Sequence, residues 1–167
     1  MHRYLISVER RAPADPQTVF DVLADPAMHP VIDGSGTVRA LTHSAPTRLH
    51  LGAEFGMDMR LGSRYHVTNR VVEFDEPRRI AWRHFNGHVW RYLLCSVDGG
   101  TLVTEQCDAT GVWNRAALAL LGFPRRNRRG MIATLDRLAV RFEQPTTMTA
   151  DPAPDLSPPP ATPDRDA

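Results

Sequence analysis

The sequence lacks several residue types and patterns that would indicate particular classes of protein. It has no lysine, and its 20 basic residues are all arginines, a bias that we attribute to the codon usage of a GC-rich genome. Its two cysteines, Cys95 and Cys107, form no disulfide framework and no Cys-x-x-Cys or Cys/His cluster, so we expect inert buried thiols and no metal site. No apolar run approaches the roughly 20 residues that span a bilayer, and no secretory signal begins the chain. We expect a cytoplasmic protein without stable membrane insertion.

Motifs for common cofactors and catalytic centres are also missing. The chain contains no G-x-S-x-G, P-loop, H-E-x-x-H or dinucleotide-binding pattern, and we predict no cofactor. Its formal net charge is only +1, and residues 1–143 hold 19 arginines against 15 acidic residues. This excess is too small to indicate nucleic-acid binding. The sequence leaves the oligomeric state open.

A change of composition divides the chain after residue 143. Half of the 14 prolines lie in 144–167, a segment without any aromatic residue. Such a segment cannot bury enough apolar surface to offset the entropy cost of ordering it. We therefore predict one folded domain over 1–143 and a proline-rich disordered tail over 144–167.

The periodicity within 1–143 predicts an α+β protein. A strand over 3–11 precedes a helix over 12–25, for which Asp15 is the expected N-cap residue. Alternating runs then predict further strands over 37–41, 53–61, 63–76, 80–85, 89–97 and 101–110. Short turns between the later runs indicate an antiparallel meander, and the paired Val71 and Val72 indicate a bulge. A helical pattern over 114–143 ends the domain, interrupted or kinked at Pro124.

Several stretches resemble the polyketide cyclase/dehydrase branch of the START-like SRPBCC superfamily, particularly its actinobacterial members. They are "ADPQTVFDVLADPAMHP", "IDGSGTVR", "TNRVVEFDEPRRIAWR", "GTLVTEQCD" and "GFPRRNRRGMIATLDRL", and the resemblance covers about 3–143. It implies a helix-grip fold, in which a curved antiparallel sheet wraps around a long C-terminal helix. It also implies an apolar cavity that opens near the loops after the first helix. Because members include cyclases, lipid and quinone carriers and hormone receptors, the resemblance leaves the reaction undetermined.

Strand parity predicts which side chains face that cavity. If the arginines of the strands point outward, the inward faces carry apolar bulk and a few polar groups, the composition of small-molecule pockets. The alternative for the large apolar residues is that they simply fill the core. The predicted ligand-binding residues are Met57, Met59, Asn69, Trp82, Trp90, Tyr92 and Leu135.

Glu105 and His84 are the candidate catalytic residues. A carboxylate on an inward strand face must be paired, protonated or in contact with cavity water, and burial would raise its pKa. Such a group suits a general acid or base in an enolisation or dehydration, with His84 beside it as the partner. The alternatives for Glu105 are an ion pair with an arginine at the cavity mouth, or a strand phase shifted by one residue that places it in solvent. The alternative for His84 is a hydrogen-bonded structural role.

The segment after the first helix, "ADPAMHPVIDGSG", places His29 and Asp33 close together. No third ligand for a metal lies nearby, and the context favours a turn or short helix over a catalytic pair. We predict that Val31 and Ile32 are apolar plugs at the mouth of the cavity and that Asp33 caps the loop.

Three functions remain compatible with the sequence. The favoured one is binding of a hydrophobic small molecule, such as a lipid, polyketide or isoprenoid, in the cavity. The second is a cyclase or dehydratase that uses Glu105 and His84. The third is a module that engages a protein or membrane through "RRNRR" at 125–129, although helical spacing favours a solvated face for these arginines.

Overall fold

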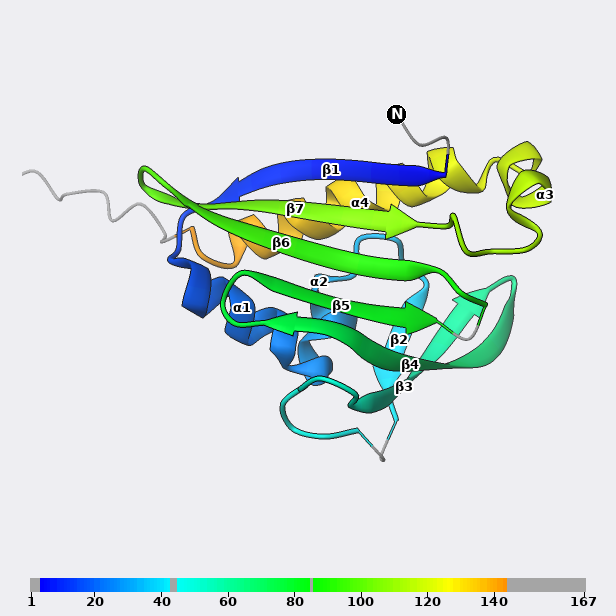
Figure 1. Cartoon of the computed structure of the whole chain (residues 1–167), viewed down its shortest axis with the longest axis horizontal. Helices are drawn as coiled ribbons and strands as arrows, with labels where there is room; N and C mark the ends of the chain where they lie inside the picture. Colours follow the sequence, from blue (N-terminus) through cyan, green and yellow to red (C-terminus); the bar gives the residue numbers. More distant parts are fainter. Residues whose placement is uncertain (1–3, 43–44, 85, 144–167) are drawn as a thin grey trace, which may run out of the picture.

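Seven strands form one antiparallel sheet that curls around the C-terminal helix (Figure 1). The computed structural model describes residues 4–42, 45–84 and 86–143. The strand order is β1-β7-β6-β5-β4-β3-β2, so β2 to β7 form a meander and β1 pairs with β7 at the other edge of the sheet. The elements are β1 (Leu5–Ala12), α1 (Pro16–Ala24), the 3-10 turn η1 (Pro26–Met28), α2 (His29–Ile32), β2 (Val38–Leu41), β3 (Glu54–Leu61), β4 (Ser63–Asp75), β5 (Arg79–His84), β6 (Val89–Val97), β7 (Gly100–Asp108), α3 (Arg115–Leu120) and α4 (Phe123–Val140).

The expected helix-grip architecture and its element order are confirmed. Asp15 caps α1, since its carboxylate accepts hydrogen bonds from the backbone N–H and the hydroxyl of Thr18 at 3.0 and 2.6 Å. The bulge also lies where the sequence predicts it, because the β4–β5 register shifts between Val71 and Glu73. The predicted tail over 144–167 lies outside the described residues.

The C-terminal helical pattern divides into two helices at Gly122. This residue has a φ of 77°, in the left-handed region that favours glycine, and α4 begins with Phe123 and Pro124 directly after it. No residue of α3 is buried, whereas α4 buries the stripe that includes Met131, Leu135 and Leu138. Figure 1 shows α3 at the end of the molecule where β7 finishes, projecting beyond the sheet.

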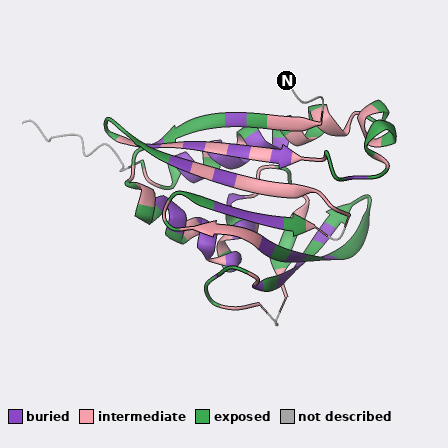
Figure 2. Cartoon of the chain, viewed as in Figure 1, coloured by how far each residue is buried: buried purple, intermediate pink, exposed green. Residues whose placement is uncertain are grey.

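Alternation along the strands separates the two faces of the sheet. In β7, the side chains of Thr101, Val103, Glu105 and Cys107 are buried and those between them are partly exposed (Figure 2). The inner face packs on α1, α2 and α4, and together they enclose the core. Strand parity therefore predicts the buried face of this strand correctly.

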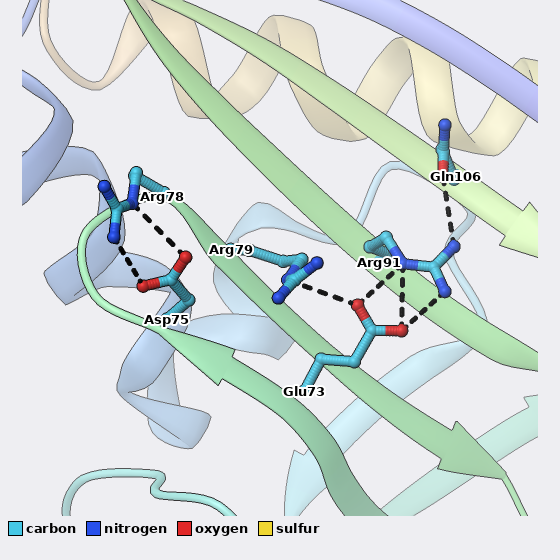
Figure 3. A network of polar contacts seen from close by, with 6 residues as sticks. All are labelled: Glu73, Asp75, Arg78, Arg79, Arg91 and Gln106. Carbon is cyan, nitrogen blue, oxygen red and sulfur yellow. Dashed lines mark hydrogen bonds and ion pairs between the residues drawn. The ribbon is translucent and has the colours of Figure 1, made fainter.

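The outer face of the sheet carries a polar network centred on Arg91 of β6 (Figure 3). Its guanidinium donates to Glu73 of β4 at 2.6 and 2.9 Å and to Gln106 of β7 at 3.1 Å. Arg79 of β5 lies 3.5 Å from the same carboxylate, so one network links four neighbouring strands. The hydrogen bonds from Arg91 lower the pKa of Glu73, which keeps the carboxylate ionised.

Candidate functional site

A cavity of about 480 Å³ lies between the inner face of the sheet and α4. Its floor comes from β3 to β7, and the loop between α2 and β2 forms one wall. Residues from α3 and the first half of α4, including Leu118, Phe123 and Met131, complete the lining. A volume of this size is in the range that holds a small organic molecule.

Four rings form a continuous aromatic wall inside the cavity. His29 stacks on Trp82 with a centroid distance of 4.7 Å and an interplanar angle of 21°. Phe55 meets both rings edge to face, at 5.3 Å from His29 and 5.7 Å from Trp82. Tyr92 lies 5.5 Å from Trp82 on the other side. This wall offers flat ring surfaces to a ligand, against which aromatic or polycyclic groups pack well.

His29 lies in the short helix α2, within the turn or short helix that the sequence predicts, and is a buried member of this wall. Its Nε2 lies 2.9 Å from the Leu23 carbonyl oxygen, so Nε2 carries the hydrogen and donates to that oxygen. Burial lowers the pKa of His29, which keeps the ring neutral. Sequence periodicity gives no sign of this role, because α2 is only four residues long and follows a 3-10 turn.

Glu105 is buried in the cavity wall near the middle of β7. Only 3% of the residue is exposed, and it lies directly opposite Tyr92 of β6. Burial raises the pKa of Glu105 to about 8; a hydrogen bond from the Tyr92 hydroxyl opposes this shift, and the charge of Asp33 adds to it. Oε2 of Glu105 has no hydrogen-bond partner among the described residues. At neutral pH the group is therefore a carboxylic acid that presents one unpartnered oxygen inside the cavity.

His84 does not lie beside Glu105, and the expected acid/base pair does not form. Glu105 is opposite Tyr92, Tyr92 is opposite Ile80 of β5, and His84 lies four residues farther along that strand. Two strand spacings and four residues separate their Cα atoms by about 16 Å. Burial and the neighbouring His88 lower the pKa of His84 to about 4, so the ring is neutral. The side chain that contacts Glu105 is Tyr92 instead.

Asn69 supplies a second unpartnered polar atom to the cavity. The residue is 2% exposed on β4, opposite Phe55 of β3 and His84 of β5. Its Oδ1 has no hydrogen-bond partner among the residues that the structure describes. Burying a carbonyl oxygen without a hydrogen-bond donor costs free energy. A ligand could supply the missing hydrogen bonds to this atom and to Glu105 Oε2.

The loop after α2 is held tightly against α4. Gly34 N–H donates to the Thr134 hydroxyl at 2.8 Å, and Arg137 donates to the Asp33 carbonyl. A Cβ atom on Gly34 would lie 2.2 Å from the Thr134 backbone nitrogen, so no larger residue fits there. The Asp33 carboxylate accepts from the backbone N–H groups of Ser35 and Val38, both at 3.1 Å. Asp33 thus organises the loop, as the sequence predicts.

The structure brings most of the predicted site residues together and leaves two outside. Ile32 also lines the cavity, but Val31 is 58% exposed and does not, because α2 turns adjacent side chains in different directions. Leu135 is buried in the core behind the cavity rather than in its lining. The predicted residues that line the cavity are Met57, Met59, Asn69, Trp82, His84, Trp90, Tyr92 and Glu105.

Charged side chains from α4 also lie at this cavity. Arg126 and Arg129 both line it and are largely exposed. The Arg126 guanidinium stacks over the Phe123 ring, 4.4 Å from its centroid. The helical spacing of the arginines correctly predicts exposure but does not reveal that two of them border the cavity.

The curled antiparallel sheet and the long C-terminal helix are the architecture of a known family. Residues 4–143 match the family described as polyketide cyclase / dehydrase and lipid transport. The chain belongs to this family. The uncharacterized protein Rv0088 of Mycobacterium tuberculosis is 36% identical over 142 residues, which cover 81% of this chain and 62% of that protein. The chain therefore spans less than two thirds of the length of this relative.

Solved structures of low sequence identity share the fold of this family member. Protein Ms6760 of Mycobacterium smegmatis aligns with a TM-score of 0.64 at 16% identity, over 83% of this chain and 90% of that one. The di-domain ARO/CYC protein StfQ of the steffimycin biosynthetic pathway aligns with a TM-score of 0.61 at 14% identity, over 83% of this chain and 50% of that one. At these identities the similarity concerns the fold alone.

None of the helices in the described part of the chain has the length and apolar composition of a membrane span.

Proposed function

We propose that this protein binds a hydrophobic small molecule, flat and oxygenated, in the cavity between the sheet and α4. The observation that carries the proposal is the pairing of an aromatic wall with two buried, unpartnered polar atoms. Apolar surface supplies affinity in such pockets, and a few polar groups fix the orientation of the ligand. A polyketide-like molecule or an oxygenated isoprenoid fits this chemistry better than a plain acyl chain.

Glu105 Oε2 and Asn69 Oδ1 need opposite hydrogen-bonding groups on the ligand, one an acceptor and the other a donor. Glu105 is protonated below a pH of about 8 and can donate to a carbonyl oxygen of the ligand. Asn69 Oδ1 can only accept, so it suits a ligand hydroxyl. They lie on β7 and β4, three strands apart in the sheet, so one ligand would span the cavity to reach both. A carbonyl at one end and a hydroxyl at the other would satisfy them.

The test compares two commercial probes that differ in one group, 9-fluorenone and fluorene. Both have the same flat ring system, but only 9-fluorenone carries a carbonyl oxygen. We expect both to bind, with 9-fluorenone tighter by about tenfold at pH 7, the worth of one hydrogen bond in a dry site. Above pH 8 the affinity for 9-fluorenone should fall as Glu105 ionises, while that for fluorene stays constant. Equal affinities at every pH would contradict the role of Glu105.

Proton transfer by Glu105 is a second candidate function. Its raised pKa makes it a carboxylic acid at neutral pH, which is the form that protonates a developing enolate or hydroxyl leaving group. Tyr92, whose hydroxyl donates to this group, is the adjacent side chain that would orient it. Incubation with a linear poly-ketone thioester tests this candidate: product formation should disappear in Glu105→Gln and persist in His84→Ala. Turnover that is unchanged in Glu105→Gln would exclude it.

A further inference from the structure

The end of the molecule that carries α3 exposes an unusual amount of apolar surface. Trp113 is 86% exposed, Leu120 90% and Leu121 75%. No residue of α3 is buried, and Figure 2 shows this helix without buried segments. Three large apolar side chains so exposed within nine residues are uncommon on a soluble surface and indicate a surface that is covered in use.

The same segment is strongly cationic. Residues 109–135 contain five arginines and no acidic residue. Arg125, Arg128 and Arg129 are exposed in the first turns of α4, directly after Leu120 and Leu121 in the chain. No ion pair joins them to an acidic side chain among the described residues. Arg128 donates to the Ser7 carbonyl at 3.1 Å. Apolar tips flanked by arginines that have no acidic partner match the surface of an anionic bilayer, where tryptophan also prefers the interface.

This surface adjoins the cavity. The cavity is lined by Leu118 of α3 and by Phe123, Arg126 and Arg129 of α4. The exposed Leu120 and Leu121 lie between Leu118 and Phe123 in the chain. A flat surface resting on the tips of α3 would thus lie beside the cavity.

We propose that Trp113, α3 and the first turns of α4 dock this protein on an anionic membrane surface, with the adjoining side of the cavity facing the lipid. The docking is peripheral, since α3 has only six residues and lies at the surface of the domain. A hydrophobic ligand could then pass between the bilayer and the cavity without crossing water. The docking surface itself does not depend on the identity of the ligand.

Co-sedimentation with vesicles tests the proposal. The wild-type protein should bind vesicles of phosphatidylcholine mixed with phosphatidylglycerol, bind pure phosphatidylcholine weakly, and dissociate in high salt. Arg125→Glu removes one positive charge and adds one negative charge. Since each charge changes the affinity for the membrane by about fivefold, binding should fall by about 25-fold. The double variant Leu120→Glu/Leu121→Glu should abolish it. Neither variant alters a residue that lines the cavity, so binding of 9-fluorenone in solution should be unchanged and reports on folding.

Two matched controls lie on other faces. Leu51→Glu changes a 62% exposed leucine in the β2–β3 connection, and Arg70→Glu changes an exposed arginine on β4. Both should keep wild-type vesicle binding. The proposal is overturned if the control and α3 variants bind vesicles equally. It is also overturned if the wild type does not bind anionic vesicles. If the wild type is then a dimer and the Leu120→Glu/Leu121→Glu variant a monomer, a second copy of the chain covers the surface instead.

Discussion

Replacing Glu105 by glutamine should stabilise the protein, and more strongly as the pH rises. In the unfolded chain this glutamate ionises near its ordinary pKa of 4.5, whereas burial raises the pKa to about 8 in the folded protein. Between these values the folded state holds a proton that the unfolded state has lost. The free energy of unfolding of the wild type therefore falls as the pH rises from 4.5 and levels off above about 8. Glutamine has nearly the same shape and does not titrate.

The size of the effect follows from the displacement of the pKa. One unit corresponds to 1.36 kcal/mol, so the gain of Glu105→Gln over the wild type should grow by about 4 kcal/mol between pH 5 and pH 9. Urea unfolding followed by circular dichroism at pH 5, 7 and 9 measures this difference. Stability curves of the two proteins that stay parallel across this range would refute the raised pKa of the buried Glu105 carboxyl group.

Three further predictions concern other parts of the fold. Gly34→Ala should cost about 3 kcal/mol of stability, since the new Cβ meets the α4 backbone at 2.2 Å. Gly36→Ala meets no atom within 4 Å but must keep a φ of 68°, so it should cost only about 1 kcal/mol in thermal melts; the reverse order would contradict the packing. Arg91→Gln should cost about 1–2 kcal/mol at pH 7, and the loss should shrink as the pH falls below 4.5, the ordinary pKa of glutamate, and the lowered pKa of Glu73 is passed; a pH-independent loss in urea titrations would count against the network. Exposed Cys95 should react with iodoacetamide while buried Cys107, with a pKa raised to about 12, does not; mass spectrometry showing two fast adducts would be inconsistent with its burial.

Strand parity accounts for most of the site residues that the sequence can predict. Alternation of period two depends only on local order, so it places Glu105, Trp82 and Tyr92 on the inner face without knowledge of the neighbouring strands. The same alternation puts Cys95 on the outer face with Arg91, and the prediction that this thiol is buried is wrong. Parity reports a face and says nothing of how far two strands are offset.

Because parity does not give the offset between neighbouring strands, the predicted contact between Glu105 and His84 is wrong. Their distance depends on the register of β5, β6 and β7, which the hairpin turns set and which no single strand encodes. The burial of His29 in the aromatic wall could not be predicted, for a different reason. This residue lies in a four-residue helix between two loops, where no periodicity shows which side chain turns inward, and the same holds for Val31 beside Ile32. Tertiary packing against α4 and the aromatic wall decides these orientations.

The central claim, that the cavity is a binding site, is tested most directly by filling it. Val67 of β4 lines the cavity and is 2% exposed, while Val97 at the end of β6 is 36% exposed and does not line it. Isothermal titration calorimetry with 9-fluorenone should give one site per chain for the wild type and for Val97→Phe, and at least a tenfold loss of affinity for Val67→Phe. Absence of saturable binding to the wild type, or equal affinity in all three proteins, would contradict the account.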